Sequence, residues 1–197
     1  MRWDNLFDDL ESQLEQELGA EEVDLLAEEE RLRLSRLSLR ERIGVMTHGP
    51  AATPLRIELR DRTRIVVSVS TVGRDWFAGD VESPARRSVS CVVPVAAVAA
   101  LFPSADQLAR TLDASVPTPS PTSLSTRLGL TFVLRDLCRR RAGVDLSTAW
   151  GRLHGTIDRV GRDHLDLAEH ERGASRRPEH LTGLRVLPLA ELLIVRF

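Results

Sequence analysis

The first forty residues carry apolar side chains at the spacing of an α-helix. Near the N-terminus they recur three or four positions apart and so form one stripe on a helical face: Trp3, Leu6, Phe7, Leu10, Leu14 and Leu18. A second set repeats every seven residues: Leu25, Leu32 and Leu39. The pattern predicts a further helix or short coiled coil from about residue 21 to 43, broken near Ser38, with Gly44 as its stop.

From residue 55 onward, apolar and polar residues alternate, which is the period of a strand with one buried face. The dipeptide Asp61-Arg62 then predicts a tight turn. Five strands this short are too few for a sandwich but can close a small barrel. The predicted elements are strands over 55–59, 65–70, 76–83 and 89–93, and a short fifth element over 95–101.

Helical patterns and a proline-rich segment follow these strands. Ser104 and Gln107 have the spacing of a capping box and predict a short helix to about residue 112. Three alternating prolines within 116–123 predict a stiff linker and a domain boundary. An amphipathic helix is predicted from about residue 125 to 141, ending at three arginines and Gly143; its apolar face comprises Leu130, Val133, Leu134, Leu137 and Cys138.

The chain contains an internal repeat. The segment 72–76 matches 160–164 at an offset of 88 residues, and 93–96 matches 187–190 at an offset of 94. Because both blocks occur in the same order and each copy follows a helix, we predict a duplicated helix-plus-five-strand unit. The predicted fold class is α+β, mainly β. Its parts are an acidic helical arm (1–38), a first barrel unit (39–102), a short helix with a proline-rich linker (103–124) and a second barrel unit (125–197).

The block from Leu153 to Leu165 resembles the first signature block of Sm-like folds, in which a bent strand carries a glycine and an aspartate opens the next strand. Gly155 and Asp163 match these two positions, whereas in the first copy Asp75 matches and Val67 replaces the glycine. The segment 186–193 resembles the last strands of Sm-like or PRC-barrel modules. The resemblance implies tandem small barrels of the Sm-like or SH3-like kind. It does not extend to the Arg-Gly dipeptide of the second Sm motif or to the Tyr-Lys-His type of Hfq signature. The whole chain also resembles a group of actinobacterial proteins, some of which are labelled transcriptional regulators.

Charge is distributed unevenly along the chain. Residues 1–30 hold twelve acidic residues against one arginine, a net charge of −11, and the remainder carries +9. Three explanations fit: an anionic partner for the basic body, an arm that folds back on it, or a solvated helix on a mildly basic domain. All 27 basic residues are arginine, and the absence of lysine excludes Schiff-base chemistry and a P-loop lysine.

The densest basic positions are the candidates for contact with nucleic-acid phosphates: Arg74, Arg139, Arg140, Arg141, Arg162, Arg176 and Arg177. Trp76 and Trp150 are candidates either for base stacking or for the core. Only 4% of the residues are aromatic, which counts against recognition by stacking. The N-terminal stripe is the candidate surface for a protein partner or homodimer: Trp3, Phe7, Leu10 and Leu14.

No catalytic motif stands out, so we predict a non-enzymatic protein without cofactor or metal. Five potential ligands lie within seventeen residues but lack a known zinc spacing: His164, Asp166, Glu169, His170 and His180. Cys91 and Cys138 lie in apolar runs and are predicted to be buried thiols in a reducing cytoplasm. The longest apolar run has fourteen residues, too few for a bilayer helix. The predicted function is a binding or regulatory module that contacts nucleic acid and is masked by the acidic arm; the alternative is an assembly scaffold.

Overall fold

A computed structural model describes residues 23–48, 53–82, 88–113, 124–174 and 176–197. The chain divides into two compact units, residues 1–38 and 39–197. In the first unit, residues 23–35 are helical, and the heptad positions Leu25 and Leu32 are exposed. The predicted stripe over Trp3, Phe7, Leu10 and Leu14 lies outside the described residues.

The helix that opens the second unit runs past its predicted stop. The helix α2 (Leu39–Thr47) follows non-helical residues 36–38, so the predicted break near Ser38 is confirmed. The prediction that Gly44 ends the helix is wrong. Gly44 is buried inside α2, and its carbonyl accepts a hydrogen bond from the backbone N–H of His48 at 3.1 Å.

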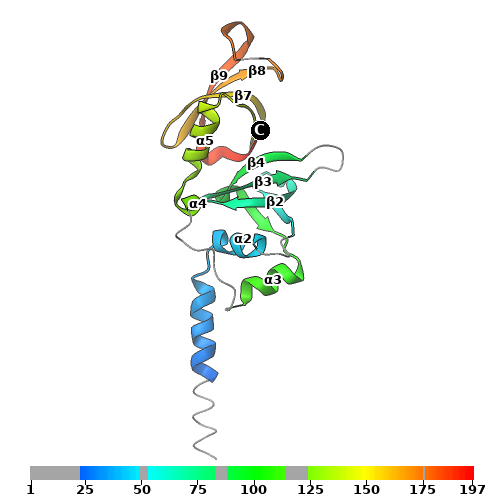
Figure 1. The fold of residues 1–197 in the computed structure, drawn as a ribbon, viewed down its shortest axis with the longest axis vertical. Coiled ribbons are helices and arrows are strands. Elements are labelled where there is room, and N and C mark those ends of the chain that lie inside the picture. Colours follow the sequence, from blue (N-terminus) through cyan, green and yellow to red (C-terminus); the bar gives the residue numbers. More distant parts are fainter. Residues whose placement is uncertain (1–22, 49–52, 83–87, 114–123, 175) are drawn as a thin grey trace, which may run out of the picture. The chain divides into compact units, whose positions relative to one another are not determined.

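Five strands make up the first half of the sheet, and neighbouring strands run antiparallel (Figure 1). β1 alternates between a core face and an outer face, as the sequence predicts, whereas the last four residues of β4 are all buried. The fifth predicted element is a 3₁₀ turn, η1 (Val95–Ala97), followed by a strand. The strands are β1 (Leu55–Leu59), β2 (Arg64–Val72), β3 (Trp76–Val81), β4 (Val89–Pro94) and β5 (Val98–Leu101).

The second half also has five strands: β6 (Gly143–Thr148), β7 (Gly151–Val160), β8 (His164–His170), β9 (Leu181–Pro188) and β10 (Leu192–Arg196). Two 3₁₀ turns precede β9 and β10: η2 (Pro178–His180) and η3 (Leu189–Glu191). All ten strands form one sheet in the order β5-β1-β2-β3-β4-β10-β6-β7-β8-β9. The prediction of a mixed fold of helices and strands is confirmed. One continuous sheet joins the two halves through β4 and β10.

The second strand of each half is irregular at corresponding places. The register of β2 against β3 shifts between Val69 and Thr71, and that of β7 against β8 shifts between Ile157 and Arg159. These positions are 88 residues apart, which is the offset of the sequence repeat. A β-bulge bends its strand and redirects a side chain. Asp158 lies between Ile157 and Arg159, so the bulge in β7 affects the direction in which its side chain points.

Helices cover parts of this sheet. The helix α2 contacts β2 and α3 (Ala105–Leu112), and α5 (Leu130–Arg139) contacts β7 (Figure 1). A short helix, α4 (Leu124–Arg127), precedes α5, so the single helix predicted from residue 125 is two. The predicted capping box of α3 is confirmed, with Ser104 and Gln107 exchanging two hydrogen bonds. The proline-rich segment 116–123 lies outside the described residues, as do residues 114 and 115.

Two apolar clusters fill the second unit. One gathers α2 and the first-half strands around Ile43 and Phe77, and the other gathers α5 and the second-half strands around Leu134 and Ile157. The predicted apolar face of α5 is confirmed, since Leu130, Leu134 and Leu137 are buried. The end of α5 differs from the prediction. Arg141, not Gly143, takes the left-handed conformation (φ 52°), and Gly143 opens β6.

Candidate functional site

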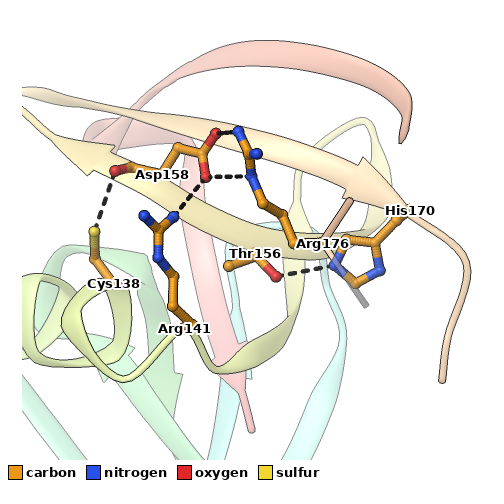
Figure 2. Close-up of polar contacts among 6 residues, drawn as sticks. All are labelled: Cys138, Arg141, Thr156, Asp158, His170 and Arg176. Carbon is orange, nitrogen blue, oxygen red and sulfur yellow. Dashed lines mark hydrogen bonds and ion pairs between the residues drawn. The ribbon is translucent and has the colours of Figure 1, made fainter. Parts of the chain in front are cut away.

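A carboxylate on the bulged strand β7 brings two distant arginines together. Asp158 accepts a hydrogen bond from Arg141 at 3.0 Å and from Nε of Arg176 at 2.9 Å, both at Oδ1. A second Arg176 nitrogen, Nη2, lies 2.5 Å from Oδ2 (Figure 2). Arg141 follows α5, and Arg176 follows β8. Folding therefore gathers at one point two side chains that lie 35 positions apart in the sequence.

The ion pairs hold Asp158 in its charged form. Hydrogen bonding from Arg176, aided by the charges of Arg176 and Arg141, lowers the pKa of the Asp158 carboxyl below its ordinary value. The same contact raises the pKa of Arg176. Two guanidinium groups thus face one carboxylate, and the trio carries one net positive charge.

A buried polar pair lies next to these charges. The hydroxyl of Thr156 is 2.9 Å from Nε2 of His170, and both residues are almost fully buried. Nδ1 of His170 is 3.0 Å from the carbonyl oxygen of Glu171. Because a carbonyl oxygen can only accept, Nδ1 carries a hydrogen, and in the neutral ring Nε2 accepts from the Thr156 hydroxyl.

A second histidine extends this polar cluster. The rings of His154 and His170 meet edge to face with centroids 5.3 Å apart. Nδ1 of His154 donates to Asp145 at 2.7 Å, and Arg172 reaches the same carboxylate oxygen at 2.8 Å. His154 is thereby fixed in orientation by a charged partner.

Arg141, Arg176, Thr156 and His170 line a hollow of about 490 Å³, together with Gly143 and Ala174. Four of its six lining residues are polar. Guanidinium groups present a planar fork of donors that matches the oxygens of phosphate or carboxylate. The arrangement is suited to holding an anion.

The structure separates the arginines that the sequence grouped. Of the run after α5, Arg139 and Arg140 both pair with Asp136, the latter at 2.7 Å, whereas Arg141 turns to Asp158. Arg139 and Arg140 lie three and four residues after Asp136, a spacing that places them beside it on the helix, so they pair with Asp136. Arg139 and Arg140 thus share one carboxylate, and Arg141 lies at another.

The remaining candidate arginines lie elsewhere. Arg177 is 4.0 Å from Glu179 and does not join its neighbour Arg176 at Asp158. Arg74 and Arg162 are exposed in the turns after β2 and β7, and the backbone N–H of Arg74 donates to the carbonyl of Leu128 at 3.0 Å. Of the seven candidates, the structure brings Arg141 and Arg176 together.

The two candidate tryptophans have different environments. Trp76 is buried, and its indole N–H donates to the carbonyl of Leu128 at 2.9 Å, so it belongs to the core. Trp150 is 70% exposed beside Arg152 and Arg196 at a hollow of about 360 Å³. Burial, together with the nearby charge of Arg152, lowers the pKa of Arg196. Trp150 remains available as a stacking surface.

The two cysteines and the histidines are the remaining candidates for reactive or metal-binding groups. Both cysteines are free; Cys91 is buried as predicted, but Cys138 is only half-buried, which differs from the prediction. The Cys138 thiol is 3.3 Å from the carbonyl oxygen of Asp158 (Figure 2). Within the described ranges, no group of three or more His, Cys, Asp or Glu residues is arranged to hold a metal ion.

Sequence reasoning missed Asp158, Thr156 and His170 as members of one site. Residues two positions apart on a strand point to the same face, so the sequence does place Thr156 and Asp158 on one face of β7. Nothing local, however, indicates that the bulge directs Asp158 toward the end of α5.

Comparisons with protein-family models, curated proteins and solved structures find no match to this chain. Among the described helices, none is long and apolar enough to cross a membrane.

Proposed function

We propose that this chain is a non-enzymatic binding module that takes up a phosphate-type anion, as carried by a nucleic-acid backbone, at the hollow beside Arg141 and Arg176. The convergence of these two guanidinium groups on Asp158 carries the proposal. Their excess positive charge faces a hollow of about 490 Å³, which has room for a phosphate group. Phosphate contacts of this kind supply much of the affinity of nucleic-acid-binding proteins.

Asp158 acts as a positioning residue in this proposal. By accepting from both arginines, it holds their side chains near each other before any ligand arrives. Pre-ordering two long side chains lowers the entropy that binding would otherwise cost. A phosphate would take donors on the two guanidinium groups that Asp158 leaves over, since each arginine has five.

The Thr156–His170 pair has the separation of a nucleophile and its base, so a catalytic role has to be weighed. Thr156 is 2% exposed. At the corresponding positions of the first half, the Ser68 hydroxyl donates to Glu82 at 3.2 Å. A polar cross-strand pair recurs there without a histidine, which favours a structural role for the pair and a non-enzymatic protein.

The proposal also includes two duplicated small barrel units, residues 39–102 and 125–197. The matching strand order of the two halves and the matching bulges in β2 and β7 support this view. A cytoplasmic location is part of the proposal, supported by the free thiols of Cys91 and Cys138.

Binding of fluorescently labelled single-stranded RNA and duplex DNA, followed by anisotropy at two salt concentrations, tests the function. We expect affinity to fall steeply with salt. Arg176→Gln should weaken binding and reduce the salt slope by about 1, the value for one lost phosphate contact. Arg177→Gln removes the same charge from the neighbouring residue, which is not at Asp158, and should change binding little. Equal effects of the two variants would overturn the proposal.

The acidic arm offers a second test. Residues 1–30 carry a net charge of −11 and should compete with a polyanion for the basic body. A chain lacking residues 1–30, shown by circular dichroism to be folded, should bind nucleic acid more tightly and with a steeper salt dependence. If this folded chain binds no nucleic acid even at low salt, the function proposed here is wrong and the assembly-scaffold alternative stands.

A further inference from the structure

The two halves of the sheet are joined at a well-packed junction. Strand β10 runs antiparallel to β4, with Val195 opposite Val92 and the N–H of Phe197 donating to the carbonyl of Ser90 at 3.1 Å. Val92 and Val195 are both 1% exposed or less and lie in one apolar cluster with Leu134 of α5. The junction therefore buries a strand edge and apolar side chains together.

A turn of the first half strengthens this junction. Oδ1 of Asp75 accepts from the backbone N–H of Leu130, the first residue of α5, at 2.7 Å. Next to it, Trp76 donates its indole N–H to Leu128. The turn between β2 and β3 thus caps a helix of the second half.

Strand registers show which residues of the two halves correspond. Val93 lies opposite Phe77, and Leu187 lies opposite Leu165, so β9 occupies in the second half the place of β4 in the first. By the same comparison, Leu101 lies opposite Ile57 and Val195 opposite Leu146, so β5 corresponds to β10. The strands β9 and β5 are the two ends of the described sheet.

The free edge at β9 is apolar. Val186 corresponds to Val92, yet it is 66% exposed, and Leu184 on the same strand is 73% exposed. Between them, Arg185 is 2.6 Å from Glu169, which neutralises its charge. Exposed apolar side chains on an unpaired edge strand are typical of a surface that adds another strand.

The strand at the other end of the sheet, β5, also has side chains exposed to solvent. In β5, Ala99 is exposed and Leu101 is half-buried, whereas their counterparts in β10, Leu193 and Val195, are fully buried. The β5 edge is thus less covered than the same edge of β10, which lies against β4.

The turn beside β9 is also exposed. The backbone of Gly161 donates to His164 at 2.8 Å, as Gly73 donates to Trp76 at 2.7 Å in the first half. The side chain of Asp163, the counterpart of Asp75, is 85% exposed.

We infer that copies of this chain assemble head to tail, with β9 of one copy antiparallel to β5 of the next and Val186 opposite Leu101. The junction between β4 and β10 is the pattern for this contact, since each edge corresponds to one of its members. A second copy is the partner that supplies the matching edge. Because the β9 edge of one copy pairs with the β5 edge of the next, every open assembly keeps one free β9 edge and one free β5 edge. Further copies therefore add until a ring closes. The inference does not depend on anion binding.

Sedimentation velocity of the full chain over a range of concentrations tests the assembly. We expect species larger than a monomer, whose fraction rises with concentration. Val186→Arg should shift the chain to monomer, because it places a charge at the centre of the proposed pairing. Phe132→Arg makes the same kind of change on α5, at a side chain that is 54% exposed, and should leave assembly unchanged.

A mixing experiment tests the head-to-tail geometry. Ala99→Arg places a charged side chain at an exposed position of β5 and so opposes pairing at that edge. Ala99→Arg and Val186→Arg should each be monomeric alone and form a 1:1 dimer when mixed, with circular dichroism confirming that both are folded.

Three results would overturn the inference. They are a wild-type chain that is monomeric at every concentration, assembly that survives both substitutions, and two monomeric variants that do not associate when mixed. Nucleic-acid anisotropy on Ala99→Arg separates this inference from the proposed function. Val186 lines a hollow with Asp158 and Arg176, whereas Ala99 lies on β5, so Ala99→Arg should lose assembly and keep anion binding.

Discussion

Removing the carboxylate of Asp75 should destabilise the junction between the two halves of the sheet. The cap of α5 comes from this side chain, because the residue before the helix, Gly129, has no side chain to donate or accept. In Asp75→Ala, the backbone N–H of Leu130 loses its partner at 2.7 Å. The substitution also removes a negative charge from the positive end of a helix.

The magnitude follows from these two contributions. Loss of a capping side chain costs about 1 kcal/mol, and loss of a favourable charge at a helix terminus costs about 0.5 kcal/mol. The Asp75 side chain is 51% exposed, so water replaces part of the lost interaction. We therefore expect the free energy of unfolding to fall by about 1 kcal/mol.

Asp163→Ala is the matched control, because Asp163 holds the corresponding place in the second half and its side chain is 85% exposed. Both substitutions are made in the Val186→Arg chain so that assembly does not contribute. Urea unfolding followed by circular dichroism gives the free energies. With Trp3 and Trp150 replaced by phenylalanine, the fluorescence of the buried Trp76 reports on the junction. Equal destabilisation by the two substitutions would refute the assignment of Asp75 as the cap of α5.

Three further outcomes are expected. Gly155→Ala should destabilise the fold by about 3 kcal/mol in urea unfolding, because its Cβ would lie 2.2 Å from a carbonyl oxygen of β8; Gly183→Ala, whose nearest neighbour would be 3.8 Å away, should be nearly neutral, and the reverse order would contradict the packing. Since the pKa of Asp158 is lowered in the folded state, its ion pairs stabilise the fold above its ordinary pKa, and this stabilisation is lost as the pH falls through the folded value. The stability difference between wild type and Arg176→Gln should therefore shrink below about pH 4 in acid unfolding, and a constant difference would contradict the pairing. Burial raises the pKa of Cys91 to about 11, so a thiolate-selective reagent at pH 8 should label it slowly until the chain unfolds, and rapid labelling of the folded chain would contradict its burial.

The strands could be predicted because their signal is local. The alternation of Leu55, Ile57 and Leu59 with charged residues places one face in the core, and these three side chains are buried. The capping box of Ser104 and Gln107 is likewise complete within four residues of sequence. Elements specified by neighbouring residues are therefore found without knowledge of the fold.

The two incorrect helix ends have a common physical reason. Glycine favours a helix stop only where nothing else determines the backbone. Gly44 lies in a buried part of α2, where packing continues the helix, and Arg141 takes the left-handed turn ahead of Gly143.

The candidate site depends on contacts that the sequence does not encode locally. The pairing of Arg139 and Arg140 with Asp136 follows helical spacing and could have been found. The contact of Arg141 with Asp158 requires α5 to end beside the bulge of β7, which depends on the tertiary fold. The same holds for the pairing of β4 with β10, since no residue pattern states which strand edges meet.

Backbone and arginine Nε signals in ¹H–¹⁵N NMR spectra of the full chain, recorded while a short single-stranded RNA is added at low salt, test the central claim most directly. The account predicts that the Nε signals of Arg141 and Arg176 and the amide signal of Gly143 shift together and saturate, because all three line the hollow. In Arg176→Gln, the Arg141 signal should shift less at the same RNA concentration. Shifts confined to residues away from this hollow, or no shifts at all, would contradict the account.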